Sequence, residues 1–111
     1  MQTMSHDYVI LTDKDGQFRT ELCDGLVPVE SYDYLFYGKR RARFVIAELQ
    51  HPVRVVLVEE APPHVRNLVP SKFLPHFPSL QAARDELQQL VSFGKLDARL
   101  QRVAGGAETA R

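Results

Sequence analysis

The apolar segments in the first half of the sequence are separated by turns of only a few residues. The stretch YVILT at positions 8–12 is apolar and β-branched, which is typical of a strand. Asp15-Gly16 follows it, and this dipeptide favours a hairpin turn because glycine accepts positive φ without a Cβ clash. Parallel strands need connections of about a dozen residues or more, so turns this short predict an antiparallel sheet.

Further strand-like segments continue the pattern and set the size of the sheet. They span residues 18–22, 26–29, 31–37, 41–49 and 53–60, with 65–69 as a further short candidate. The segment 53–60 is apolar on both faces, which indicates a central strand covered on two sides. We therefore expect a curled antiparallel sheet of about five or six strands, arranged as a meander or a half-barrel.

Prolines interrupt the sequence after these strands. Pro70, Pro75 and Pro78 are spaced too closely for ladder pairing or a regular helix. The same stretch carries the apolar side chains Phe73, Leu74 and Phe77. Because such side chains need burial, we expect this segment to wrap around the sheet. The alternative is that it docks in the groove of a partner.

Residues 79–93 have the pattern of one amphipathic helix. Apolar side chains recur at steps of three and four and form a single stripe, made by Leu80, Ala83, Leu87, Leu90 and Val91. Ser79 is a good N-cap, and Gly94 is placed to end the helix. The residues that follow fit either a short helix or an edge strand over 99–103. Strands first and the main helix last indicate an α+β fold, with a C-terminal helix that lies across the sheet or plugs its open end.

Composition limits the class of protein. With 111 residues the chain fits one domain, which we place at 1–103, followed by a flexible tail at 104–111. Lys plus Arg and Asp plus Glu number 14 each, so no net charge attracts the chain to nucleic acid or membrane. The single cysteine, Cys23, excludes an internal disulfide and fits a reducing compartment. No apolar run is long enough for a membrane span, so we expect no membrane contact and a cytoplasmic location.

Aromatic and cationic side chains are concentrated between positions 31 and 43, and they form the candidate binding site. Its residues are Tyr32, Tyr34, Tyr37, Lys39, Arg40, Arg41 and Arg43. Tyrosine is favoured at interfaces because it buries well and keeps a polar tip, and arginine binds carboxylates and phosphates through two hydrogen bonds. Aromatic side chains on both faces of 31–37 indicate one face on the core and one facing a partner, or else a core on both faces.

Four interpretations of the cationic hairpin remain open. It binds a protein partner or a second copy of the chain, or it binds an acidic small molecule. It holds single-stranded nucleic acid by phosphate contacts and stacking, which is the weakest of the binding alternatives because the net charge is zero. In the fourth interpretation its charges only keep the edge of the sheet soluble.

The sequence predicts no catalytic constellation, no metal site and no cofactor. Cys23 has the acidic neighbours Glu21 and Asp24, which raise a thiol pKa and oppose a nucleophilic role. The four histidines lack the close spacing of metal-binding motifs. The Asp-rich turn at 13–16 lacks the later ligands of a calcium loop, and no phosphate-binding glycine motif occurs.

We therefore expect a small non-catalytic accessory or regulatory module, acting as a subunit or a homodimer through the aromatic and basic sheet surface. The alternative is a small-molecule binding protein or small enzyme with a tyrosine- and arginine-lined pocket between sheet and helix. One helix stripe covers one face of a sheet. Apolar surface on 53–60 must then be covered by the proline-rich segment or by another molecule.

Overall fold

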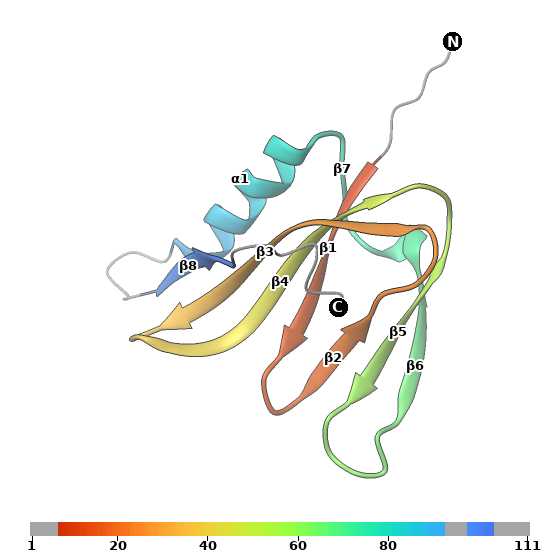
Figure 1. The fold of residues 1–111 in the computed structure, drawn as a ribbon, viewed down its shortest axis with the longest axis horizontal. Coiled ribbons are helices and arrows are strands. Elements are labelled where there is room, and N and C mark those ends of the chain that lie inside the picture. The colour runs from red at the N-terminus through yellow and green to blue at the C-terminus, as the bar shows by residue number, and fades with distance from the viewer. Residues whose placement is uncertain (1–6, 93–97, 104–111) are drawn as a thin grey trace.

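An open antiparallel sheet with one α-helix on it forms the fold, as seen in the computed structural model, which describes residues 7–92 and 98–103 (Figure 1). The strands are β1 (Asp7–Lys14), β2 (Phe18–Glu21), β3 (Leu26–Phe36), β4 (Lys39–Leu49), β5 (Arg54–Glu59), β6 (Arg66–Pro70), β7 (His76–Phe77) and β8 (Ala98–Arg102). The helices are the 3₁₀ turn η1 (Ser71–Phe73) and α1 (Leu80–Val91). The strand order is β6-β5-β2-β1-β4-β3-β8, with β7 also paired to β1.

This architecture confirms the mainly antiparallel sheet, with a single α-helix among the described residues, but the expected number of strands is wrong. The order is also not a meander, because β1 pairs with β4 and β2 pairs with β5. The described residues form eight strands instead of five or six. One extra strand, β7, comes from the proline-rich segment, where Tyr8 pairs with Phe77 and Val9 pairs with His76. Ladder pairing is possible there because the prolines flank this two-residue strand and do not lie inside it.

The long hairpin of the sheet is bent at a corner. β2 continues into β3 and β4 continues into β5, so that two chain connections, 22–25 and 50–53, run side by side. The Gln50 N–H donates to the Gly25 carbonyl oxygen at 2.8 Å. Gly25 has φ 101°, and a Cβ on it would lie 2.7 Å from side-chain atoms of His51 and Val53. A side chain at this position is excluded both by backbone conformation and by space.

Each face of the curled sheet has its own apolar core. The first core contains the buried residues Val9, Leu11, Leu26, Ala47, Leu49 and Val55, with Leu74 packed against them. The second core lies under α1 and joins Ile46 of β4 to Ala83 and Leu87 of the helix, with Phe77 at its margin. Alternate residues of β1 and β4 therefore point into opposite cores, as the two-residue period of a strand requires.

The helix begins as the sequence indicates, but it is not the last element. The Ser79 side chain accepts a hydrogen bond from the Ala82 N–H at 3.0 Å, which makes Ser79 the N-cap. The helix has 12 residues, and no described helix is long and apolar enough to cross a membrane. Strand β8 follows it and pairs with β3, so the edge-strand alternative for 99–103 applies. Phe93, Gly94 and the predicted tail at 104–111 lie outside the described residues.

β5 is an interior strand that pairs with β2 and with β6, but it lies one strand from the edge, because β6 has no second partner among the described strands, whereas β1 and β4 occupy the middle of the sheet. One expectation about the proline-rich segment is wrong. Phe73 is 70% exposed instead of buried. Of the wrapping segment, only Leu74 and Phe77 pack against the cores. The helix lies over β1, β4, β7 and β8, so it does not cover the apolar residues near β6.

Candidate interaction surfaces

The β3–β4 hairpin carries the aromatic and cationic residues that the sequence singles out. Its turn is formed by Tyr37 and Gly38, which both have positive φ (52° and 79°), as in the two-residue turns that suit the twist of a hairpin. Arg40 forms a bidentate ion pair with Asp15, with nitrogen–oxygen distances of 2.9 and 3.2 Å. Arg43 lies 2.8 Å from the Asp33 carboxylate. Two of the four cations are therefore neutralised within the chain.

Two of the three candidate tyrosines, Tyr32 and Tyr34, lie away from the free cations of this hairpin. Tyr32 packs at the margin of the core under α1, and Tyr34 lies two residues further on the same face, with its ring 6.3 Å from that of Phe44. Tyr37 is at the tip, 61% exposed and edge-on to the ring of Phe36. Lys39 and Arg41 are exposed and form no ion pair with another described residue. The predicted site is thus divided between the half-buried Tyr32 and Tyr34 and an exposed tip that carries Tyr37, Lys39 and Arg41.

An acidic residue that the sequence analysis did not select lies between the sheet and the helix. Pro28 of β3 is opposite Ala47 and Glu30 is opposite Ile46, so Val29 is an extra residue that forms a β-bulge. The bulge shifts the alternation by one and turns Glu30 to the helix side of the sheet. Glu30 is only 3% exposed, and it accepts hydrogen bonds from Arg84 of α1 through both carboxylate oxygens.

Two further groups complete this cluster. The Tyr32 hydroxyl donates to Glu30 Oε1 at 2.7 Å, and Arg102 of β8 lies 3.5 Å from Glu30 Oε2 and over the Tyr32 ring. Hydrogen bonds from Arg84 are the main cause that lowers the pKa of Glu30 to about 2. Burial and the hydrogen bond to Glu30 raise the pKa of Tyr32. The carboxylate is therefore ionised, and it holds one helix and two strands together.

A cavity of about 260 Å³ opens beside this cluster. Its lining residues are Tyr32, Arg84, Leu87, Gln88 and Leu100. This is a tyrosine- and arginine-lined pocket between sheet and helix, which is the type that the sequence predicts for a small-molecule site. The arginine comes from the helix and not from the β3–β4 hairpin. With two guanidinium groups on one carboxylate, the cluster keeps one net positive charge.

Two shallow grooves meet at the η1 end of β6. The larger, of about 460 Å³, is lined by Pro52, Val53, Arg54, Pro70, Ser71 and Lys72. The smaller, of about 230 Å³, shares Pro52, Ser71 and Lys72 with it and extends to His76 and Asp7. Arg54 and Lys72 give this region a positive charge. Neither cation forms an ion pair with another described residue, although Lys72 lies over the Phe73 ring at 5.3 Å.

His76 connects β7 to η1 and to the first residue of β1 through contacts of its two ring nitrogens. Its Nδ1 lies 2.8 Å from Asp7 Oδ2 and its Nε2 lies 2.8 Å from the Ser71 carbonyl oxygen. Both partners are acceptors, so the two ring nitrogens can satisfy both contacts only when each carries a proton. The hydrogen bond to Ser71, and then the one to Asp7, raise the pKa of His76.

The outer edge of β6 is unpaired among the described strands. The backbone N–H of Glu59 donates to the Val65 carbonyl, and the backbone N–H of Ser71 donates to the Val53 carbonyl. These two pairs mark the ends of the β5–β6 ladder. In an antiparallel ladder only every second residue bonds to a given neighbour. The backbone groups of Asn67 and Val69 therefore face β5, and those of Arg66 and Leu68 face outward. Figure 1 shows β6 at one margin of the sheet and β8 at the other.

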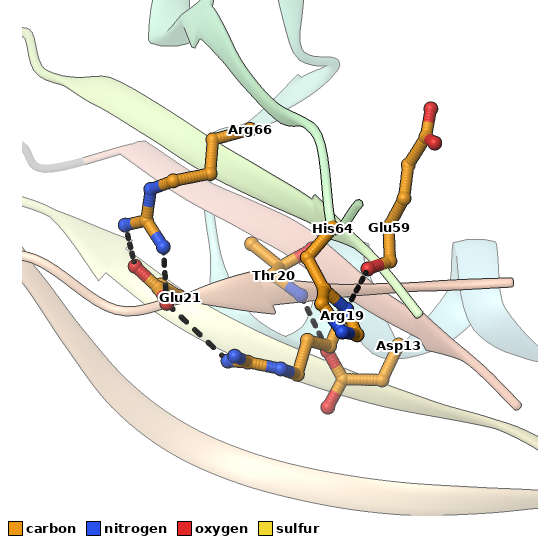
Figure 2. Close-up of polar contacts among 7 residues, drawn as sticks. All are labelled: Asp13, Arg19, Thr20, Glu21, Glu59, His64 and Arg66. Atoms are coloured by element: carbon orange, nitrogen blue, oxygen red, sulfur yellow. Dashed lines mark hydrogen bonds and ion pairs between the residues drawn. The ribbon is translucent and has the colours of Figure 1, made fainter. Parts of the chain in front are cut away.

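The β6 edge, by which we mean residues 65–73, exposes apolar side chains. Leu68 is 58% exposed, Val65 42% and Phe73 70%. Arg66 does not keep a free charge beside them, because its guanidinium reaches over β5 to Glu21 at 2.7 Å. Figure 2 shows Arg66 and Arg19 converging on the Glu21 carboxylate from two strands. The hydrogen bonds from Arg66 are the first cause that lowers the pKa of Glu21.

Sequence reasoning missed both the Glu30 cluster and the β6 edge. An acidic residue directly after the apolar run at 26–29 was the available signal for Glu30, but its partners Arg84 and Arg102 are distant in the sequence. Among residues 7–92 and 98–103, no group of three or more His, Cys, Asp or Glu side chains is arranged to hold a metal ion. The whole chain matches no protein-family model, and comparisons with curated proteins and with solved structures give no significant match.

Proposed function

We propose that this protein is a non-catalytic interaction module that binds a protein partner along the β6 edge. The observation that supports it is the outer edge of β6, which pairs with no other described strand and exposes Leu68 at 58%, together with Phe73 of the following 3₁₀ turn at 70%. Unpaired N–H and C=O groups on a strand are a template for another strand, and exposed apolar residues beside them provide burial on binding. The charged grooves at the η1 end extend the same surface.

Edge strands usually carry features that prevent them from pairing with another chain, and the β6 edge has only some of these features. Pro70 at its end removes one donor, and Arg66 supplies a charge, but that charge is neutralised by Glu21. At the other end of the sheet, the tip of the β3–β4 hairpin adds a smaller surface made by Tyr37, Lys39 and Arg41. We propose it as a separate contact for an acidic protein surface, because Lys39 and Arg41 keep their charges while Arg40 and Arg43 already have acidic partners within the chain.

Site-specific photocross-linking tests this function. A photoreactive phenylalanine analogue replaces Leu68, and in a control protein it replaces Leu90, an exposed leucine of α1 with 42% exposure. In cells of the native host, position 68 is expected to form covalent adducts with a protein chain, and position 90 is not. Adducts at neither position, or the same adducts at both, would contradict the proposal.

A second candidate function rests on the cavity beside Glu30. A small aromatic carboxylate fits its chemistry, because Tyr32 and Leu100 offer apolar surface and the cluster has one excess positive charge. Benzoate is a suitable probe, followed by chemical-shift changes of the Tyr32 and Leu100 resonances. The Arg102→Gln variant removes the excess charge and is expected to abolish binding, whereas shifts of equal size in both proteins would exclude the site.

A further inference from the structure

We propose that the partner of the β6 edge is a second copy of this chain, related by a two-fold axis that passes beside Leu68. This inference rests on the proposed function and names its partner. In the pairing, the two β6 strands run antiparallel and join two sheets into one. An antiparallel arrangement is the one that a two-fold axis perpendicular to the sheet produces, and it makes the contact self-complementary.

The outward backbone groups of β6 are suited to this register. Leu68 lies opposite Leu68 of the second copy, and each donates its free N–H to the carbonyl of the other. Arg66 then lies opposite Pro70 of the second copy, and the Arg66 N–H donates to the Pro70 carbonyl. Because proline has no N–H, only the Arg66 carbonyl of this pair is left without a strand partner. The two leucine side chains, each 58% exposed in the single chain, face each other directly.

The charges at the two ends of β6 favour the same orientation. At the η1 end, Arg54 and Lys72 line the larger groove. At the other end, the β5–β6 turn carries Glu59 and Glu60, both exposed and without an ion pair to another described residue. Figure 1 shows this turn and η1 at opposite ends of β6. Antiparallel pairing places the acidic turn of each copy beside the basic groove of the other, whereas parallel pairing would bring like charges together.

The size of the contact determines how strongly the copies associate. A strand of five residues is roughly 17 Å long, so the pairing and its flanking side chains bury less surface than a permanent dimer needs. The two copies therefore exchange between monomer and dimer, and the fraction of dimer depends on concentration. Net charge does not oppose the association, because the chain has equal numbers of acidic and basic residues.

Sedimentation velocity over a range of concentrations tests the proposal. The wild-type chain is expected to shift from monomer to dimer as its concentration rises. Leu68→Lys places like charges opposite each other at the two-fold axis and is expected to weaken the dimer by about tenfold or more. Leu90→Lys is the matched control and is expected to behave like the wild type. Leu68 is exposed, so circular dichroism should show both variants folded.

Charge reversal provides a second, independent measurement. The double variant Arg54→Glu, Lys72→Glu is expected to weaken the dimer, and adding Glu59→Lys with Glu60→Lys in the same chain is expected to restore it, because both ends of β6 then carry reversed charges. A wild-type chain that stays monomeric at every concentration overturns the inference, as does equal behaviour of the Leu68 and Leu90 variants. If that monomeric chain still forms adducts with another protein at position 68, the self-association fails while the proposed function stands.

Discussion

At the residue scale, one extra residue in β3 determines the chemistry between the sheet and the helix. Without the bulge at Val29, the alternation of the strand would place Glu30 in the apolar core on the other face. With the bulge, Glu30 meets Arg84, Arg102 and Tyr32, and its burial is offset by charge-assisted hydrogen bonds. The bulge therefore converts a costly buried charge into a connection between α1, β3 and β8.

The Glu30→Gln variant tests this connection. It leaves the two guanidinium groups without their carboxylate, so we expect the free energy of unfolding at neutral pH to fall by about 2 kcal/mol. The folded pKa of Glu30, about 2, is below its unfolded value of 4.5, so its stabilisation is present above pH 4.5 and is lost as the pH falls toward 2. The variant should lack this loss. Urea unfolding at several pH values measures both effects.

Tyr32→Phe is the matched comparison for Glu30→Gln. It removes one hydrogen bond and keeps every charge, so the expected cost is about 1 kcal/mol. Most of the pH dependence of stability should remain, because Arg84 is the main cause that lowers the pKa of Glu30. A Glu30→Gln protein as stable as the wild type would show that the cluster does not hold the helix to the sheet.

His76 predicts a second pH dependence, of opposite sign. Its folded pKa is raised, so its stabilising contribution is complete below the unfolded value of 6.5 and is lost as the pH rises through the folded value. The loss should stay within about 1 kcal/mol because the ion pair with Asp7 is partly exposed. Thermal unfolding between mildly acidic and mildly alkaline pH should show this slope in the wild type. His76→Gln should show a smaller slope, and identical slopes would contradict the role of His76.

At the scale of elements, the corner between the two halves of the long hairpin shapes the sheet. The connections 22–25 and 50–53 lie side by side because Gly25 has no side chain and adopts positive φ. The hairpin turns at Gly16 and Tyr37-Gly38 also need positive φ, but they are at open positions on the surface. Substitution is therefore restricted by backbone conformation alone at Gly16 and Gly38, and by both conformation and lack of space at Gly25.

Gly25→Ala and Gly16→Ala separate these two costs. Both substitutions strain a positive φ, which costs about 1 kcal/mol. Only at Gly25 does the new Cβ meet His51 and Val53 at 2.7 Å, so we expect that variant to lose about 1–3 kcal/mol more. Denaturant unfolding of the two variants and the wild type provides the measurement. Equal losses would mean that the corner has room for a side chain.

At the scale of the whole molecule, the described sheet ends in two edge strands, β6 and β8. β1 and β4 are paired on both sides and separate the two cores, while β6 has a neighbour on one side only among the described strands. Protection of backbone amides from exchange follows such differences, because central strands open only with global unfolding. We therefore expect the backbone amides at the surface that we propose for binding to exchange faster than those of the central strands.

Amide hydrogen exchange of the dilute protein tests this picture. Along β6 the protection should alternate, with Asn67 and Val69 slow because they donate to β5, and with Arg66 and Leu68 fast because they face outward. The amides of β1 and β4 should be the slowest of all. If Leu68 is as protected as Asn67 in dilute monomer, the outer edge of β6 is covered, and the edge cannot be the binding surface.

The sequence by itself determined the features that depend on neighbouring residues. Apolar alternation and short turns predicted an antiparallel sheet, and the three- and four-residue steps with Ser79 as cap predicted the helix, because periodicity and capping are local properties. The tertiary structure alone decided the bulge at Val29, the partners of Glu30 and the position of β6 at the margin of the described sheet. These depend on strand order and register, which arise from contacts between residues that are far apart in the chain.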